Sequence, residues 1–173
     1  MPTRPHWLLA AVALAALVLA GGSSSASAPP CTGSQLGGNF VVIVGSAGAG
    51  SISYQLNVRR VSGRTCFVSG LPRIQLLSRL RQPLPTTVVR ADRRAMPAVP
   101  VVLGPGHGAR AQARFSPDVP GVGEPVAGRN CERPAFSMRV TLLPGSATFL
   151  APVRPPTPVC EHGRMAVSGL APA

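Results

Sequence analysis

The stretch that decides the fold is residues 51–72, SISYQLNVRRVSGRTCFVSGLP. In its first half apolar side chains alternate with polar ones, with Ile52, Tyr54, Leu56 and Val58 on one side and Ser53, Gln55, Asn57 and Arg59 on the other. This period of two is typical of a strand with one buried and one solvated face. Ser62 and Gly63 then supply turn chemistry, and Cys66 opens a second strand. The stretch therefore predicts a β-hairpin with a cysteine at its centre.

The rest of the chain predicts further short strands around this hairpin. No long segment keeps a helical period, and 19 glycines and 20 prolines separate the apolar runs. The expected strands are residues 39–44, 73–78, 86–90, 101–103, 109–116, 136–143, 148–150 and 165–170. Residues 39–44 (NFVVIV) predict a central strand buried on both faces, and the prolines of residues 152–158 predict an irregular connection. Together these patterns predict an all-β sandwich or barrel of about eight strands.

The amino-terminal segment has the pattern of a secretory signal peptide. A start that carries Arg4 precedes the apolar run of residues 7–20, and small residues follow up to residue 28. The run is short for a membrane-spanning helix, which needs about 20 apolar residues. We therefore expect a signal peptide over residues 1–28 that is cleaved between residues 22 and 28. Residues 29–173 then form a single secreted domain without a membrane span, in the extracellular space or associated with the cell wall.

Four cysteines remain in the secreted chain: Cys31, Cys66, Cys131 and Cys160. An even number of cysteines in an exported chain of this size predicts two disulfides. Three pairings are open. The pairs Cys31–Cys66 and Cys131–Cys160 are favoured because sequential neighbours close the shortest loops.

A zinc site is the competing use of these cysteines, and it would combine Cys160 with His162. The chain has no CxxC pair, and only His107 and His162 remain after signal removal. We therefore predict no metal and no cofactor.

The charge is strongly positive, with a net value of +12 that comes entirely from arginine. Such a charge favours an anionic surface as partner, although the lysine-free composition is also what a GC-rich genome produces by codon bias. Nucleic-acid binding usually needs a basic stripe interleaved with stacking aromatics. Here Trp7 leaves with the signal peptide and Tyr54 is expected in the core, so nucleic acid is not expected as a partner.

No stretch predicts a catalytic site. The five acidic residues fall in expected loops or beside cysteines, and no Gly-x-Ser-x-Gly motif occurs. The glycine-rich residues 45–50 lack the Lys-Ser/Thr of a phosphate-binding loop and precede a strand. His107 lies in a glycine turn without a nearby acid, which favours a turn residue over a catalyst. We therefore expect a protein that is not an enzyme.

The order and spacing of several motifs resemble a known family. The motifs are Tyr54-x-Leu56, Cys66-x-x-x-Gly70-x-Pro72-x-Ile74-x-Leu76, Leu103-x-Pro105-Gly106-x-x-Ala109-x-Ala111, Cys131 and Cys160. The chain is similar over residues 31–170 to the exported four-cysteine family called domain of unknown function 4232, found mostly in high-GC Gram-positive bacteria. The resemblance implies an immunoglobulin-like antiparallel β-sandwich and no known activity.

These observations leave three hypotheses for the function. The first is a non-enzymatic module of the cell envelope or extracellular space with a binding or structural role, whose partner could be another secreted protein. The second is a basic protein that binds anionic envelope polymers by charge. The third, a cell-wall hydrolase, would need a converging pair of carboxylates.

Overall fold

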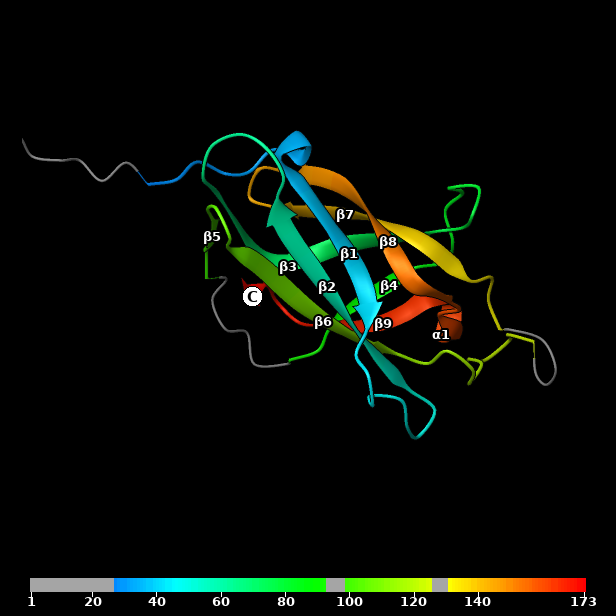
Figure 1. The fold of residues 1–173 in the computed structure, drawn as a ribbon. Helices are drawn as coiled ribbons and strands as arrows, with labels where there is room; N and C mark the ends of the chain where they lie inside the picture. The colour runs from blue at the N-terminus through cyan, green and yellow to red at the C-terminus, as the bar shows by residue number, and fades with distance from the viewer. Residues whose placement is uncertain (1–26, 93–98, 126–130) are drawn as a thin grey trace, which may run out of the picture.

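The computed structural model describes residues 27–92, 99–125 and 131–173. Residues 1–26 of the expected signal peptide lie outside this part of the chain. The described elements are η1 (Gly33–Gln35), β1 (Leu36–Val42), β2 (Ile52–Arg60), β3 (Cys66–Leu77), β4 (Thr87–Arg90), β5 (Val101–Leu103), β6 (Gly108–Phe115), β7 (Ala135–Leu143), β8 (Ala147–Thr157), α1 (Cys160–Gly163), β9 (Arg164–Val167) and β10 (Ala171–Pro172) (Figure 1). The all-β class expected from the sequence is therefore confirmed.

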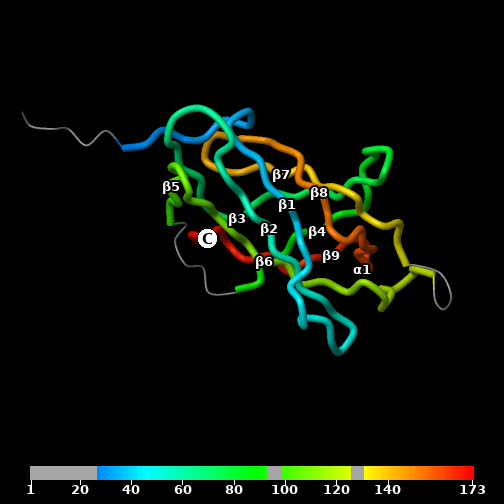
Figure 2. Tube along the Cα trace, viewed as in Figure 1, coloured from blue at the N-terminus to red at the C-terminus, as the bar shows by residue number. Residues whose placement is uncertain are grey.

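The described strands form one continuous sheet rather than two separate ones. Its order is β4-β9-β6-β2-β1-β8-β7-β3-β5, and β10 pairs with β6. The long strand β8 joins the two halves, because its residues 147–152 and Thr157 pair antiparallel with β7, whereas Val153 and Arg154 pair parallel with β1. The sheet curls into a half-barrel around the core, as the trace in Figure 2 shows. It is thus not clearly the expected immunoglobulin-like sandwich of about eight strands.

The hairpin expected from residues 51–72 does not form. Strand β2 pairs with β1 and β6, whereas β3 pairs with β5 and β7. After β2 the Val61 N–H still donates to the Gln35 carbonyl at 2.7 Å, so the chain follows β1 before it crosses to the other half. The alternation predicted the buried faces correctly, but those faces pack against each other through the core instead of pairing edge to edge.

The core contains the inward side chains of both halves. Strand β6 buries Ala109, Ala111, Ala113 and Phe115 and exposes the residues between them, as its alternation predicted. The Tyr54 ring packs against Phe40 and Phe115, with centroid separations of 4.9 and 5.3 Å. The Tyr54 hydroxyl bonds to the Thr157 hydroxyl and donates to the Pro155 carbonyl at 3.1 Å. This cluster holds the second part of β8 against β2.

Two further expectations are corrected by the structure. Strand β1 is central, but it buries one face only, because Phe40 is buried while its neighbour Val41 is half-buried on the outward side. Residues 152–157 belong to β8 despite their prolines. Pro155 and Pro156 are exposed near the end of the strand, where the only pairs with β1 are Phe40 with Val153 and Val41 with Arg154, so few ladder donors are needed.

Two disulfides close different ends of the fold. Cys31 bonds to Cys66 and ties the lead-in of β1 to the start of β3 in the other half of the sheet. Cys131 bonds to Cys160 and ties the segment before β7 to α1. These are the pairs favoured on loop length. Bridges of this kind are typical of proteins in oxidising compartments.

In the described part of the chain, no helix has the length and apolar character needed to cross a membrane.

Removing either disulfide should destabilise the domain strongly. The bridges close loops of 35 and 29 residues, and loop entropy then predicts a loss of about 4 kcal/mol for each. We expect Cys31→Ala/Cys66→Ala and Cys131→Ala/Cys160→Ala to lower the free energy of unfolding by similar amounts, measured by urea denaturation. A pair of variants in which one retains full stability would contradict this expectation.

Removing the Tyr54 hydroxyl should weaken the junction between β2 and β8. The Tyr54→Phe change keeps the ring but deletes two buried hydrogen bonds, and we expect a loss of about 1–2 kcal/mol in the free energy of unfolding. Thr148→Val is the matched control, because it deletes a hydroxyl from an exposed position. The control should lose less than about 0.5 kcal/mol, and equal losses in the two variants would contradict the proposed anchor.

Candidate functional site

Five exposed arginines project from one side of the sheet: Arg59, Arg110, Arg114, Arg154 and Arg164. The strand register places them on the same side. Arg110 stands opposite Asn57 of the polar side of β2, Arg114 stands opposite Ala166 of β9, and Arg154 stands opposite Val41 of β1. We call this outward side of β8, β1, β2, β6 and β9 the arginine face.

Few negative groups offset the charge of this face. The described acids are Asp92, Asp118, Glu124, Glu132 and Glu161. The ion pairs within the described residues join Glu161 to Arg164 at 3.8 Å and Glu124 to His162 at 3.7 Å. In the same part of the chain, Arg59, Arg110 and Arg154 have neither an acidic partner nor a hydrogen-bond partner. They are therefore available to an anion from solvent.

The outward side of the other half of the sheet carries less charge. On β3 and β7 it bears Arg73 and Arg139, which stand opposite Thr141 and Gln75. Leu150 of β8 stands opposite Arg139 and is exposed. The arginine face therefore carries the larger number of outward arginines, five over five strands.

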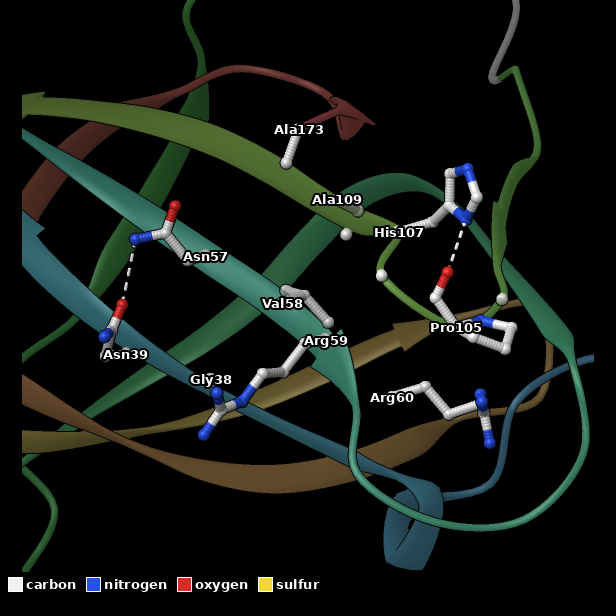
Figure 3. A pocket seen from close by; sticks show the side chains of 13 residues that line it. Gly38, Asn39, Asn57, Val58, Arg59, Arg60, Pro105, His107, Ala109 and Ala173 are labelled. Atoms are coloured by element: carbon white, nitrogen blue, oxygen red, sulfur yellow. Dashed lines mark hydrogen bonds between the residues drawn. The ribbon is translucent and has the colours of Figure 1, made fainter.

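A groove of about 530 Å³ lies where the arginine face meets the turn at residues 104–108 (Figure 3). Asn39 and Asn57 lie at one end of it, and His107 lies at the other. The volume falls within the range of small-ligand sites, about 300–1,000 Å³.

Arg59 lines this groove without side-chain neighbours across the strands. Its partners in the register are Gly37 of β1 and Gly108 of β6. Neither glycine has a side chain, and Val61 Cγ1 and Ala173 Cβ lie 2.9 and 3.3 Å from where a Cβ would stand at Gly37 and Gly108. Arg110 is the diagonal neighbour, at the distance of about 7–8 Å that long side chains can bridge.

The amide side chains at the end of the groove have fixed orientations. The Gln55 amide donates to Asn57 Oδ1 at 2.6 Å, and Asn57 Nδ2 donates to Asn39 Oδ1 at 2.9 Å. This relay leaves Asn39 Nδ2 as a donor without a partner among the described residues. His107 Nδ1 donates to the Pro105 carbonyl at 2.9 Å, so this exposed histidine is a turn residue, as its sequence context predicted.

Arg60 lies on the opposite side of β2 from Arg59, beyond the end of the core, and also lines the groove. Its Nη1 donates to the carbonyls of Ser62 and Gly63. Its Nε is buried and has no hydrogen-bond partner, the single such side-chain atom in the described ranges. No described acid pairs with this half-buried guanidinium, which therefore adds uncompensated positive charge at the groove.

A second polar centre, built on Glu124, lies at the α1 end of the fold. The side chain of Glu124 is 2% exposed. One carboxylate oxygen accepts the N–H groups of Gly121 at 2.6 Å and Glu161 at 2.9 Å, and the other accepts the His162 N–H. Glu161, His162 and Gly163 all have left-handed backbone, with φ of 54°, 56° and 74°. Such a turn presents its N–H groups to one anion, and the carboxylate clamps the loop before β7 onto it.

These contacts set the pKa of Glu124. Burial by itself would raise the pKa, but the backbone donors of His162, Gly121 and Glu161, together with the nearby His162 ring, outweigh it. The pKa of Glu124 is therefore lowered from its ordinary value of 4.5. A carboxyl held ionised in this way is poorly suited to act as a general acid.

Ligand atoms of Glu124, Glu132 and His162 lie within 4.8 Å of one another. Both oxygens of Glu124 already accept hydrogen bonds from backbone N–H groups, so this carboxylate has a structural role that competes with metal binding. The zinc alternative built on Cys160 fails for a separate reason, since the Cys160 sulfur is bonded to Cys131. The bridges likewise leave no free thiolate among the described cysteines.

Comparison with known proteins gives one match. A family model described as Domain of unknown function (DUF4232) matches residues 31–170, which is most of the chain. No curated protein and no solved structure matches the chain.

Replacing Glu124 should remove both stability and its acid dependence. In Glu124→Gln one acceptor becomes an N–H group that faces backbone donors, and we expect the free energy of unfolding to fall by about 2–3 kcal/mol at neutral pH. Because the folded pKa lies below the unfolded one, the carboxylate stabilises the wild type fully above about pH 4.5 and loses this effect as the pH falls. Urea denaturation across this range measures both effects.

The matched control is Asp118→Asn, which removes the same charge from an exposed residue that accepts no hydrogen bond in the described structure. It should retain the acid dependence of the wild type. The role of Glu124 would be refuted if Glu124→Gln and Asp118→Asn gave the same stability at neutral pH and the same loss on acidification.

Proposed function

Because the chain belongs to the DUF4232 family, whose function is unknown, its role must be inferred from its own surface, and we propose an exported, non-catalytic module that binds an anionic polymer of the cell envelope through the arginine face. The observation that carries the proposal is the gathering of Arg59, Arg110 and Arg154 on one side without described acidic partners. A surface of one sign attracts polymers of the opposite sign and concentrates them before contact.

Export is supported by two independent features. The amino-terminal sequence has the charged start, apolar run and small residues of a signal peptide. The two disulfides belong to the chemistry of oxidising compartments.

A non-catalytic role is supported by the placement of the acids. A glycosidase needs two carboxyls that reach a substrate, about 5–10 Å apart. Glu124 and Glu132 lie close enough, but Glu124 is buried and committed to backbone donors. The groove is lined by arginines, amides, glycines, one histidine and a few apolar residues, and it has no acidic side chain.

The immunoglobulin-like arrangement belongs to the same proposal. We infer a variant of that sandwich in which β8 passes from one sheet to the other. The two alternating inner faces that pack across the core support this inference.

Neutralising the arginine face should weaken polyanion binding more than removing equal charge elsewhere. The test variant is Arg59→Gln/Arg110→Gln/Arg154→Gln, and the matched control is Arg64→Gln/Arg73→Gln/Arg139→Gln. Both sets consist of exposed arginines. With residues 29–173 and a soluble polyglycerol phosphate as probe, we expect the test variant to lose at least about tenfold in affinity, or 1.4 kcal/mol, and the control about threefold or less.

Binding should be measured at about 50 and 200 mM salt, because an interaction made by charge weakens as salt rises. Equal losses in the two variants would show that net charge alone acts and would refute a dedicated face. Absence of binding by the wild type at low salt to this probe and to wall fractions would refute a polymer role, and would favour a secreted protein as the partner.

A further inference from the structure

The groove beside Arg59 differs from the rest of the arginine face in having shape as well as charge. We propose that it is a subsite that binds one phosphate or carboxylate group carried on a sugar or polyol unit of the polymer. This inference rests on the proposed function of the arginine face. It names the part of that face that binds a single unit of the polymer.

The polar groups without partners in the groove are donors. Arg59 has no described partner, and the amide relay from Gln55 through Asn57 leaves Asn39 Nδ2 free to donate. The Pro105 carbonyl already accepts from His107. Phosphate and carboxylate oxygens are acceptors, and a guanidinium can bind two of them at once. A donor-rich groove therefore fits an oxoanion.

Arg60 gives the groove charge that the fold does not neutralise. Its Nε is buried without a partner, and its two hydrogen bonds go to neutral carbonyls of the following turn. A buried N–H donor that has no acceptor costs free energy. An anion bound in the groove would offset part of this cost, so the site gains from an occupant of negative charge.

The turn at residues 104–108 leaves room for such a group. Gly37 and Gly108 flank Arg59 in the register, and the turn at residues 104–108 contributes three glycines to the wall. A Cβ at Gly106 would meet nothing within 4 Å, so a ligand can approach the backbone of the turn closely there. The volume of about 530 Å³ is sufficient for one sugar or polyol unit with its charged substituent.

Other hollows of the described structure are less suited to an anion. A hollow of about 380 Å³ at the other end of the arginine face contains Arg114 and Arg164. There Arg164 already faces Glu161 at 3.8 Å, and Arg114 Nε donates to the Ser51 hydroxyl at 2.9 Å. A third hollow is mainly apolar, and its Arg79 lies over the Phe136 ring. Only the groove beside Arg59 combines free donors with uncompensated charge among these three.

The test compares single substitutions of equal charge inside and outside the groove. Arg59→Gln removes a groove arginine, and Arg154→Gln removes one from the same face outside it. The probes are short oligomers of glycerol phosphate and of a uronic acid, with a neutral dextran oligomer as blank, so that a phosphate and a carboxylate source are distinguished. We expect Arg59→Gln to lose at least tenfold in affinity for one or both charged oligomers and Arg154→Gln less than threefold.

A second pair adds a negative charge instead. Asn39→Asp keeps the oxygen that accepts from Asn57, so the strand pairing is retained while the free donor becomes a carboxylate. Gln112→Glu makes the same charge change at an exposed position of the face outside the groove. Asn39→Asp should abolish oligomer binding, and Gln112→Glu should reduce it less than threefold. Thermal unfolding checks that all four variants remain folded.

The outcomes separate the two proposals. If the two variants of each pair lost the same affinity for the oligomers while the wild type still bound long polyglycerol phosphate, the groove would not be the subsite. The proposed role of the arginine face would then remain. Failure of the wild type to bind the long polymer as well would overturn both. Arg59→Lys retains the positive charge but loses the two parallel N–H donors of the guanidinium. Full oligomer binding by this variant would show that a guanidinium holding two oxygens of the oxoanion is not needed.

Discussion

The structure depends on one strand that serves both halves of the sheet. The first part of β8 pairs with β7, and its second part pairs with β1, so the sheet must curl between them. The Tyr54 hydroxyl holds the second part by its bonds to Thr157 and to the Pro155 carbonyl. If this junction opened, β1 and β2 would lose their connection to β7 and β3, and the core between the halves would be exposed to water.

The two disulfides add stability to a core that buries little apolar area. Aromatic residues make up 4% of the sequence, and β6 presents mainly alanines to the interior. Small side chains allow close approach of the halves, but each buries little apolar area. The Cys31–Cys66 bridge and the Cys131–Cys160 bridge secure separate ends, and the Glu124 carboxylate adds a polar clamp beside the second bridge.

Much of this fold could be predicted from local patterns, because alternation decides which side of a strand is buried. The inward alanines of β6 and the buried Tyr54 follow from it directly. Alternation does not decide which strands become neighbours, so residues 51–72 predicted a hairpin, whereas β2 pairs with β1 and β6 and β3 pairs with β5 and β7. The role of Glu124 was not predictable either, since its donors come from residues 121, 161 and 162 and meet only in the folded chain.

The difference between what local patterns predict and what the folded chain brings together also applies to the excess of arginine. Codon bias can set the number of arginines, and alternation sends any arginine within a strand outward, which accounts for about one outward arginine per strand in both halves. Five arginines share the outward side of one half, whereas β3 and β7 carry Arg73 and Arg139 on theirs. Arg59 and Arg60 are not explained in this way, because adjacent residues of a strand point to opposite sides and yet both line one groove at the strand end. Placement of this kind supports a binding role better than composition alone.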